Sequence, residues 1–159
     1  MKGICLRYTE SEDDAEDILQ EAFIRAFKSL KQFDCAQGKL GGWIRTITIN
    51  VAIENYRKNK TRLKHYSEHS LDQQDHYNDE IIAKLELQEL LSIIQKLPDG
   101  YRMVFNLYAI EGFTHKEISS TLGISIGTSK SQFSRAKKLL QQMILETNKY
   151  EHITTRHAR

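Results

Sequence analysis

Apolar residues recur at helical spacing on both sides of a glycine turn within residues 111–144. Thr114 and Glu117 have the spacing of a capping box, which predicts a helix that begins at Thr114. Gly123 can end this short helix in a left-handed conformation. Ser125 is a second N-cap candidate, ahead of a longer helix with apolar positions Phe133, Ala136, Leu140 and Met143. Two helices joined by a glycine-containing turn form a helix-turn-helix, and the pattern predicts one here.

The polar face of this second helix is basic and rich in hydroxyl groups. Its residues are Lys130, Ser131, Ser134, Arg135, Lys137 and Lys138. No acidic residue occurs between Glu117 and Glu146. Because a DNA duplex carries about one negative charge per 1.7 Å of axis, such a helix suits the major groove. The alternative is an ordinary helical hairpin with a solvated basic face, but the agreement of capping box, glycine turn and acid-free helix favours DNA binding.

A second strongly periodic segment follows the capping signal of Ser11 and Asp14. Its apolar positions are Ala15, Ile18, Leu19, Ala22, Phe23, Ala26, Phe27 and Leu30, which predicts a helix. The outer face of its first turns carries Glu12, Asp13, Glu16, Asp17, Gln20 and Glu21. The helix dipole favours acidic residues near the N-terminus of a helix. One interpretation is therefore a face that is exposed only to solvent. A docking surface for a basic partner is the other.

The periodicity of residues 43–53 is ambiguous. Ile47, Ile49, Val51 and Ile53 alternate as in a strand, whereas Ile44, Ile47 and Val51 fit a helix. We predict a helix, because no other segment reads as a strand and an isolated strand is not stable. The segment continues into a basic, partly aromatic stretch, of the kind that binds single-stranded nucleic acid, at Tyr56, Arg57, Lys58, Lys60, Arg62 and Lys64.

These patterns predict an all-α chain with two small helical domains joined by a flexible linker. The predicted boundaries are 1–58 for the first domain, 59–78 for the linker, 79–146 for the second domain and 147–159 for a frayed tail. Pro98, the only proline, is expected to open a helix of the second domain. His65 and His69 are spaced for metal chelation, but solvated linker histidines are favoured because no third ligand stands at a useful spacing.

Composition narrows the class of protein. The 159 residues are 40% hydrophobic and 28% charged, as in globular proteins, and the net charge is +2. That charge is uneven, with seven acids and no base from Tyr8 to Ile24. Cys5 and Cys35 form no C-x-x-C motif, which suits a reducing cytosol, and neither a signal peptide nor a membrane span is evident. Phosphate-binding loops and nucleophile elbows are also missing, so we expect a binding protein with no cofactor rather than an enzyme.

Two motifs in the same order resemble those of bacterial RNA polymerase sigma factors, most closely the extracytoplasmic-function branch. They are DAEDILQEAFIRAF at 14–27 and EGFTHKEISSTLGISIGTSKSQFSRAKKLL at 111–140, and the similarity extends from about Ile4 to Leu145. The resemblance implies promoter DNA and core RNA polymerase as partners, with an anti-sigma factor as a regulator. It also implies that the acidic helix docks on the clamp helices of core polymerase through Asp14, Asp17, Gln20 and Glu21.

The resemblance assigns DNA-binding residues in both domains. The family pattern W-x-x-x-I-x-x-N matches Trp43, Ile47 and Asn50. By similarity this helix and the loop before it open the minus-ten element and hold an extruded base, with contacts from Trp43, Asn50, Tyr56, Arg57 and Lys58. The helix-turn-helix would read the minus-thirty-five element through Ser125, Thr128, Lys130, Ser131, Ser134, Arg135 and Lys138. The second domain would sit on the polymerase flap, and the linker would run towards the active-site cleft.

The sequence departs from the family pattern in two places. Tyr108 stands where some members have a basic residue that faces the promoter backbone. Members also usually carry about one more helix before the segment MKGICLRY. Part of the apolar surface of the helix at 12–31 is therefore expected to remain exposed, and an upstream extension is expected to raise the melting temperature.

Two other functions fit parts of the sequence. A stand-alone helix-turn-helix regulator would bind duplex DNA as a dimer, and its first domain would show a ligand pocket or alternating strands and helices. A pure protein adaptor would leave the basic helix unexplained. The acidic helix and the aromatic-basic helix of the first domain favour the sigma factor over both.

Overall fold

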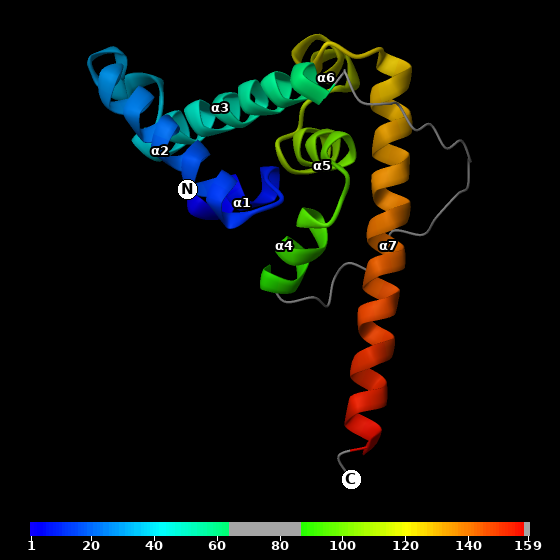
Figure 1. Cartoon of the computed structure of the whole chain (residues 1–159). Helices are drawn as coiled ribbons and strands as arrows, with labels where there is room; N and C mark the ends of the chain where they lie inside the picture. The colour runs from blue at the N-terminus through cyan, green and yellow to red at the C-terminus, as the bar shows by residue number, and fades with distance from the viewer. Residues whose placement is uncertain (64–86, 158–159) are drawn as a thin grey trace.

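The computed structural model describes the backbone of residues 1–63 and 87–157, and the side chains of residues 1–60 and 88–146. Every regular element in these ranges is helical, which confirms the all-α fold (Figure 1). Among the described helices, none combines the length and apolar character needed to cross a bilayer.

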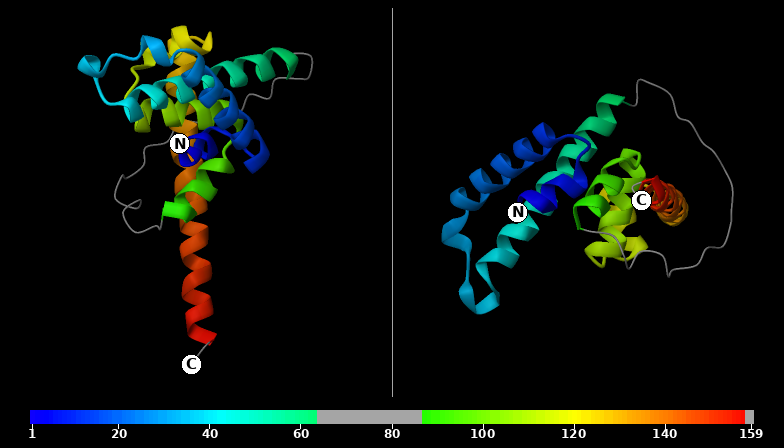
Figure 2. Two further views of the ribbon diagram at one scale, coloured as in Figure 1. Left: turned by 90° about the vertical axis from the view of Figure 1, so that its left-hand side faces the viewer. Right: turned by 90° about the horizontal axis from the view of Figure 1, so that it is seen from below.

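The first half of the chain consists of α1 (Lys2–Tyr8), α2 (Glu12–Lys28) and α3 (Leu40–Leu63). Ser11 caps α2 as predicted, because its hydroxyl accepts a hydrogen bond from the Asp14 amide at 3.1 Å. Two short 3-10 turns, η1 (Leu30–Gln32) and η2 (Cys35–Gln37), lead into α3, which runs alongside α2 (Figure 2). The ambiguous segment 43–53 is therefore helical, and its β-branched residues are buried by neighbouring helices rather than by a sheet.

The second half contains α4 (Leu87–Gln95), α5 (Asp99–Phe105), α6 (His115–Leu122) and α7 (Ile126–His157). The predicted helix-turn-helix is α6 and α7. Both bonds of the capping box form: the Glu117 amide donates to the Thr114 hydroxyl at 3.2 Å, and the Thr114 amide donates to the Glu117 carboxylate at 2.8 Å. Gly123 ends α6 with φ +62°, and Ser125 caps α7 by accepting from the Thr128 amide at 2.9 Å.

Some boundaries differ from the prediction. Helix α3 continues to Leu63, beyond the predicted domain end at residue 58. Helix α7 continues to His157, through most of the segment 147–159 that was expected to fray, since no glycine or proline follows Gly127 to end it. The predicted linker histidines His65 and His69 lie outside the described residues.

One element has no signal in the periodicity. The segment η4 (Asn106–Ile110) is a π-helical turn between α5 and Gly112, and the Glu111 amide donates to the Asn106 carbonyl at 3.0 Å. Such turns are rare and often occur at functional positions.

The apolar core joins the two halves of the chain. One cluster combines Ile18, Val51 and their neighbours in α1–α3 with residues of the second half, namely Met103, Val104, Leu107, Ile118 and Leu122. A smaller cluster within the second half packs α4 against α7 through Ile94, Leu140 and others. Helices α1 and α3 consequently pack on α5, so the two halves are in contact with each other (Figure 2).

The C-terminal part of α2 and the turn after it expose apolar side chains, as the sequence predicts. Ala15, Ile18, Ala22 and Ala26 are buried against α1 and α3. The larger residues Phe23, Ile24, Phe27 and Leu30 are exposed, and Phe27 retains 72% of its accessible surface.

Candidate nucleic-acid interface

The N-terminal half of α7 presents one basic, acid-free face. Ser125, Lys130, Ser131 and Ser134 are exposed on it, and Thr128, Arg135 and Lys138 are half-buried. The opposite face is buried against α4–α6 through Ser129, Ala136 and Leu140. The structure thus brings the predicted minus-thirty-five residues together on one surface of the second helix of the motif.

An aromatic cluster joins η4, α6 and α7. The rings of Tyr108 and His115 are stacked with centroids 4.3 Å apart, and Tyr108 also meets Phe133 at 4.5 Å. His115 Nδ1 lies 2.9 Å from the hydroxyl of Ser129 on α7. Burial lowers the pKa of His115, and the charge of Lys130 lowers it further. Tyr108 therefore helps to fix the position of α7 relative to α6.

The loop before α3 forms a pocket beside Trp43. Its volume is about 330 Å³, and its lining includes Phe33, Asp34, Gln37 and Trp43. The Phe33 and Trp43 rings are tilted with centroids 5.5 Å apart. Asp34 holds the loop by accepting from the Ala36 amide at 2.9 Å, and Gly38 adopts φ +151°. Aromatic faces and polar groups thus converge where the resemblance places an extruded base.

The remaining predicted minus-ten residues differ in their exposure. Asn50 and Arg57 are exposed, and Lys58 borders a groove of about 250 Å³ that also contains Asp17 and Glu21. Tyr56 instead packs on the core shared by the two halves. Burial raises the pKa of Tyr56, and Asp99 of the second half raises it further.

The predicted docking residues lie along the outer face of α2. Asp14, Asp17 and Gln20 are exposed, and Glu21 is half-buried. Asp14 accepts from the Ser11 hydroxyl at 2.6 Å, so it also serves the cap. Glu21 accepts from Arg25 at 2.7 Å, and this bond lowers the pKa of Glu21. The face remains predominantly acidic and open to solvent.

Sequence reasoning missed a charged cluster between the halves. The Glu111 side chain, only 5% exposed, accepts from Arg7 of α1 at 3.1 Å and from Arg45 of α3 at 2.5 Å. Burial raises the pKa of the adjacent Tyr8, and Glu111 raises it further. The only signal in the sequence is a single acid that interrupts the apolar run before Gly112.

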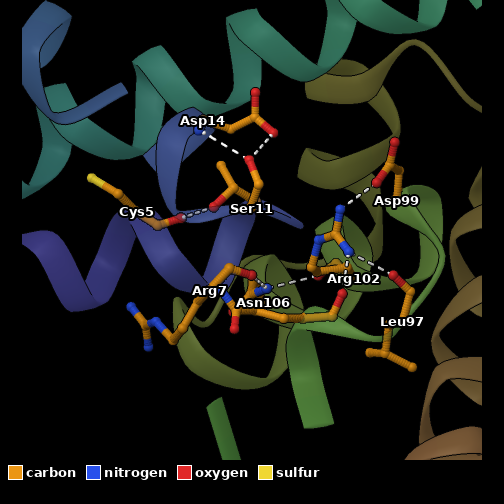
Figure 3. Close-up of polar contacts among 10 residues, drawn as sticks. Cys5, Arg7, Ser11, Asp14, Leu97, Asp99, Arg102 and Asn106 are labelled. Atoms are coloured by element: carbon orange, nitrogen blue, oxygen red, sulfur yellow. Dashed lines mark hydrogen bonds and ion pairs between the residues drawn. The ribbon is translucent and has the colours of Figure 1, made fainter. Parts of the chain in front are cut away.

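Asn106 of η4 adds a second polar link between the halves (Figure 3). Its side-chain amide donates to the carbonyl of Arg7 at 2.7 Å and to that of Arg102 at 2.8 Å. The buried Arg102 guanidinium in turn donates to the carbonyls of Gln95 and Leu97 and to Asp99. The π-helical turn is therefore bound to α1 through Arg7 and to α5 through Arg102.

These features define an all-helical nucleic-acid-binding protein with a helix-turn-helix. Comparison with known families is more specific: residues 1–62 match sigma-70 region 2, and residues 87–140 match sigma-70 region 4. The chain is 32% identical over 154 residues to the extracytoplasmic-function (ECF) sigma factor SigW of Bacillus subtilis, covering 89% of this chain and 81% of SigW. The chain belongs to the ECF sigma factors of RNA polymerase.

Other relatives agree with this assignment. SigE of Mycolicibacterium smegmatis is 29% identical over 145 residues, which cover 89% of this chain but only 56% of SigE. A solved structure of the sigma factor RpoE with the anti-sigma factor NepR from Bartonella quintana aligns with a TM-score of 0.53. That alignment covers 91% of this chain and 89% of the other at 23% identity, and it supports the fold.

Proposed function

We propose that the chain directs core RNA polymerase to promoters with a minus-ten and a minus-thirty-five element. The observation that carries this proposal is the presence of both sigma-70 regions in one chain, each with a surface of suitable chemistry. The chain acts as a binding subunit in the cytoplasm and contributes no catalytic group of its own. A stand-alone regulator is disfavoured because the first half matches sigma-70 region 2.

Helix α7 reads the minus-thirty-five element. A helix fits the major groove, where lysine and arginine recognise guanine and hydroxyl groups contact bases or phosphates. Lys130, Ser131 and Ser134 are exposed on the acid-free face, with Arg135 beside them. The stack of Tyr108, His115 and Phe133 fixes the orientation of this face.

The pocket beside Trp43 receives an unpaired base of the minus-ten element. An extruded base is recognised by stacking on aromatic rings and by hydrogen bonds to its polar edge. Phe33 and Trp43 supply the rings, and Asp34 and Gln37 supply polar groups in the same pocket. Asn50, exposed about two turns further along α3, contacts the adjoining strand.

Helix α2 docks on a basic surface of core polymerase. Asp17 and Gln20 are exposed on its acidic face, where their charge and amide group are accessible to a partner. We also propose an anti-sigma factor as a regulatory partner, with support from the relative whose structure contains one.

Size-exclusion chromatography with core RNA polymerase tests this proposal. The wild-type chain should co-elute with the core enzyme, and the double variant Asp17→Lys, Glu21→Lys should not. Circular dichroism should be unchanged, because exposed charges contribute little to folding stability. Glu146→Lys, a reversal at an exposed position of α7, is the control and should co-elute. Failure of the wild type to co-elute would contradict the proposed function, and co-elution of the double variant would remove α2 from docking.

A further inference from the structure

The pocket beside Trp43 combines an aromatic wall with one acid and one base. Among the described residues that line it, Asp34 is the only acid and Lys39 the only basic residue. Its volume of about 330 Å³ lies at the lower end of the range for small-ligand sites, which suits a single nucleobase. The Phe33 and Trp43 rings, with centroids 5.5 Å apart, already contact each other. A base therefore stacks on this pair from one side, and its edge is left to the polar groups of the lining.

The carboxylate of Asp34 is oriented by its own loop. Oδ1 accepts from the Ala36 amide at 2.9 Å, and Oδ2 accepts from the side-chain amide of Gln37 at 3.3 Å. A carboxylate has about four lone-pair sites, so both oxygens can accept a further hydrogen bond. The residue is exposed, which leaves these sites accessible to a ligand. The pocket thus offers a fixed acceptor before any base enters it.

Asp34 also interrupts a basic stretch of the sequence. Between Glu21 and Glu54 it is the only acid. The basic residues of this stretch are Arg25, Lys28, Lys31, Lys39 and Arg45. Basic side chains attract the phosphates of DNA, whereas a carboxylate repels them. The cap of η2 does not require this charge, because asparagine caps a helical turn as well as aspartate does. A hydrogen bond from a base gives the carboxylate a role that the cap does not.

The exocyclic groups of the four bases decide which edge suits a carboxylate. A carboxylate accepts hydrogen bonds and donates none. Adenine, cytosine and guanine each carry an amino group that donates, whereas thymine carries carbonyl oxygens and no amino group. The N3–H of thymine lies between two of these oxygens, so a carboxylate that approaches it also meets like charge. Asp34 should therefore favour a base with an amino group and disfavour thymine.

We propose that Asp34 is a specificity-determining residue that accepts a hydrogen bond from the amino group of the extruded minus-ten base and rejects thymine at that position. This inference rests on the proposed function, because it names the class of base that the pocket accepts. Phe33 and Trp43 bind any base by stacking, since every base has an aromatic face. Selection among the bases then falls to the polar side of the pocket.

Single-stranded minus-ten oligonucleotides test this proposal with the chain bound to core polymerase. Unpaired strands remove the contribution of duplex melting from the measurement. At each position in turn, cytosine is compared with uracil, and adenine and guanine are each compared with hypoxanthine, which lacks the amino group of both. At one position the wild type should bind an amino-bearing base about five- to ten-fold more tightly than its comparator.

Asp34→Asn separates base selection from the cap. The amide keeps an oxygen that can accept from Ala36, but it replaces the other carboxylate oxygen with a donor. The variant should therefore lose the preference for the amino group or reverse it in favour of the carbonyl. A purely structural role for Asp34 would instead change binding of both members of a pair alike. Glu10→Gln, an equal loss of charge at an exposed position before α2, is the control and should keep the preference.

The outcomes distinguish this inference from the proposed function. Binding of the wild-type complex with no position that prefers an amino group would overturn the role of Asp34 alone. A preference that Asp34→Asn leaves unchanged would overturn it as well. Failure of the wild-type complex to bind any of the oligonucleotides would contradict the proposed function, and the role of Asp34 with it.

Discussion

His115 of α6 and Ser129 of α7 are joined by a hydrogen bond of 2.9 Å on the buried side of α7. Ser129 is fully buried, so its hydroxyl depends on this partner within the protein. The bond fixes the two helices of the motif relative to each other. Loss of the bond is expected to alter how α7 enters the major groove of DNA.

The stability of the folded protein should depend on pH through His115. Because the folded pKa of His115 lies below its unfolded value of about 6.5, the folded state favours the neutral ring. Stability from this site is complete above pH of about 6.5 and is lost as pH falls through the lower folded pKa. Chemical denaturation at pH 7.5 and 5.5 should show a smaller acid-induced loss for His115→Gln than for wild type. An equal loss in both would contradict the assignment.

Replacement by alanine should have opposite effects on stability at two glycines near the turn between α6 and α7. Gly123 has φ +62°, a conformation that costs other residues about 1 kcal/mol, so Gly123→Ala should destabilise the protein. Gly127 lies in the first turn of α7, where an added Cβ would meet only the Ser125 hydroxyl at 3.6 Å. Gly127→Ala should be neutral or stabilise by up to about 1 kcal/mol. Thermal denaturation of the two variants measures this, and equal effects would refute it.

A third prediction separates base readout from phosphate binding. Lys130→Ala and Arg135→Ala should each cost about 1–3 kcal/mol in promoter binding by the polymerase complex and relax the preference at one base pair. Lys138→Ala should weaken binding to all DNA sequences alike and reduce the salt dependence of binding. Lys96→Ala, exposed after α4, is the control. Unchanged selectivity in both Lys130→Ala and Arg135→Ala would exclude this helix from base readout.

Local signals in the sequence predicted much of the fold. The capping box at Thr114, the left-handed Gly123 and the cap at Ser11 depend on residues within a few positions of one another, and all three form as expected. The segment after Trp43 is predicted as a helix only when the whole chain is considered, since its β-branched run by itself favours a strand. The exposed face of α7 likewise follows from helical periodicity.

The contact between the halves could not be predicted in this way. Glu111 meets Arg7 and Arg45 across 104 and 66 residues of sequence, a distance over which periodicity carries no information. The basic neighbours of Tyr56 in the sequence predict a contact with nucleic acid. In the structure, Tyr56 packs on the core shared by the two halves, and this long-range contact leaves no local signal in the sequence. The roles assigned to individual residues in DNA and polymerase binding stay predictions.

The central claim is that this chain makes core RNA polymerase promoter-specific, and run-off transcription tests it most directly. The free protein should bind duplex promoter weakly, with a steep loss on adding salt, because single-stranded minus-ten DNA is not available in a duplex. Addition of core enzyme fixes both domains on one promoter and raises the effective concentration of the second contact. We predict site-specific transcripts with wild type, and a larger defect in promoter opening than in initial binding for Asn50→Ala. Tight, specific duplex binding by the protein alone, with no transcript when core enzyme is supplied, would contradict the account.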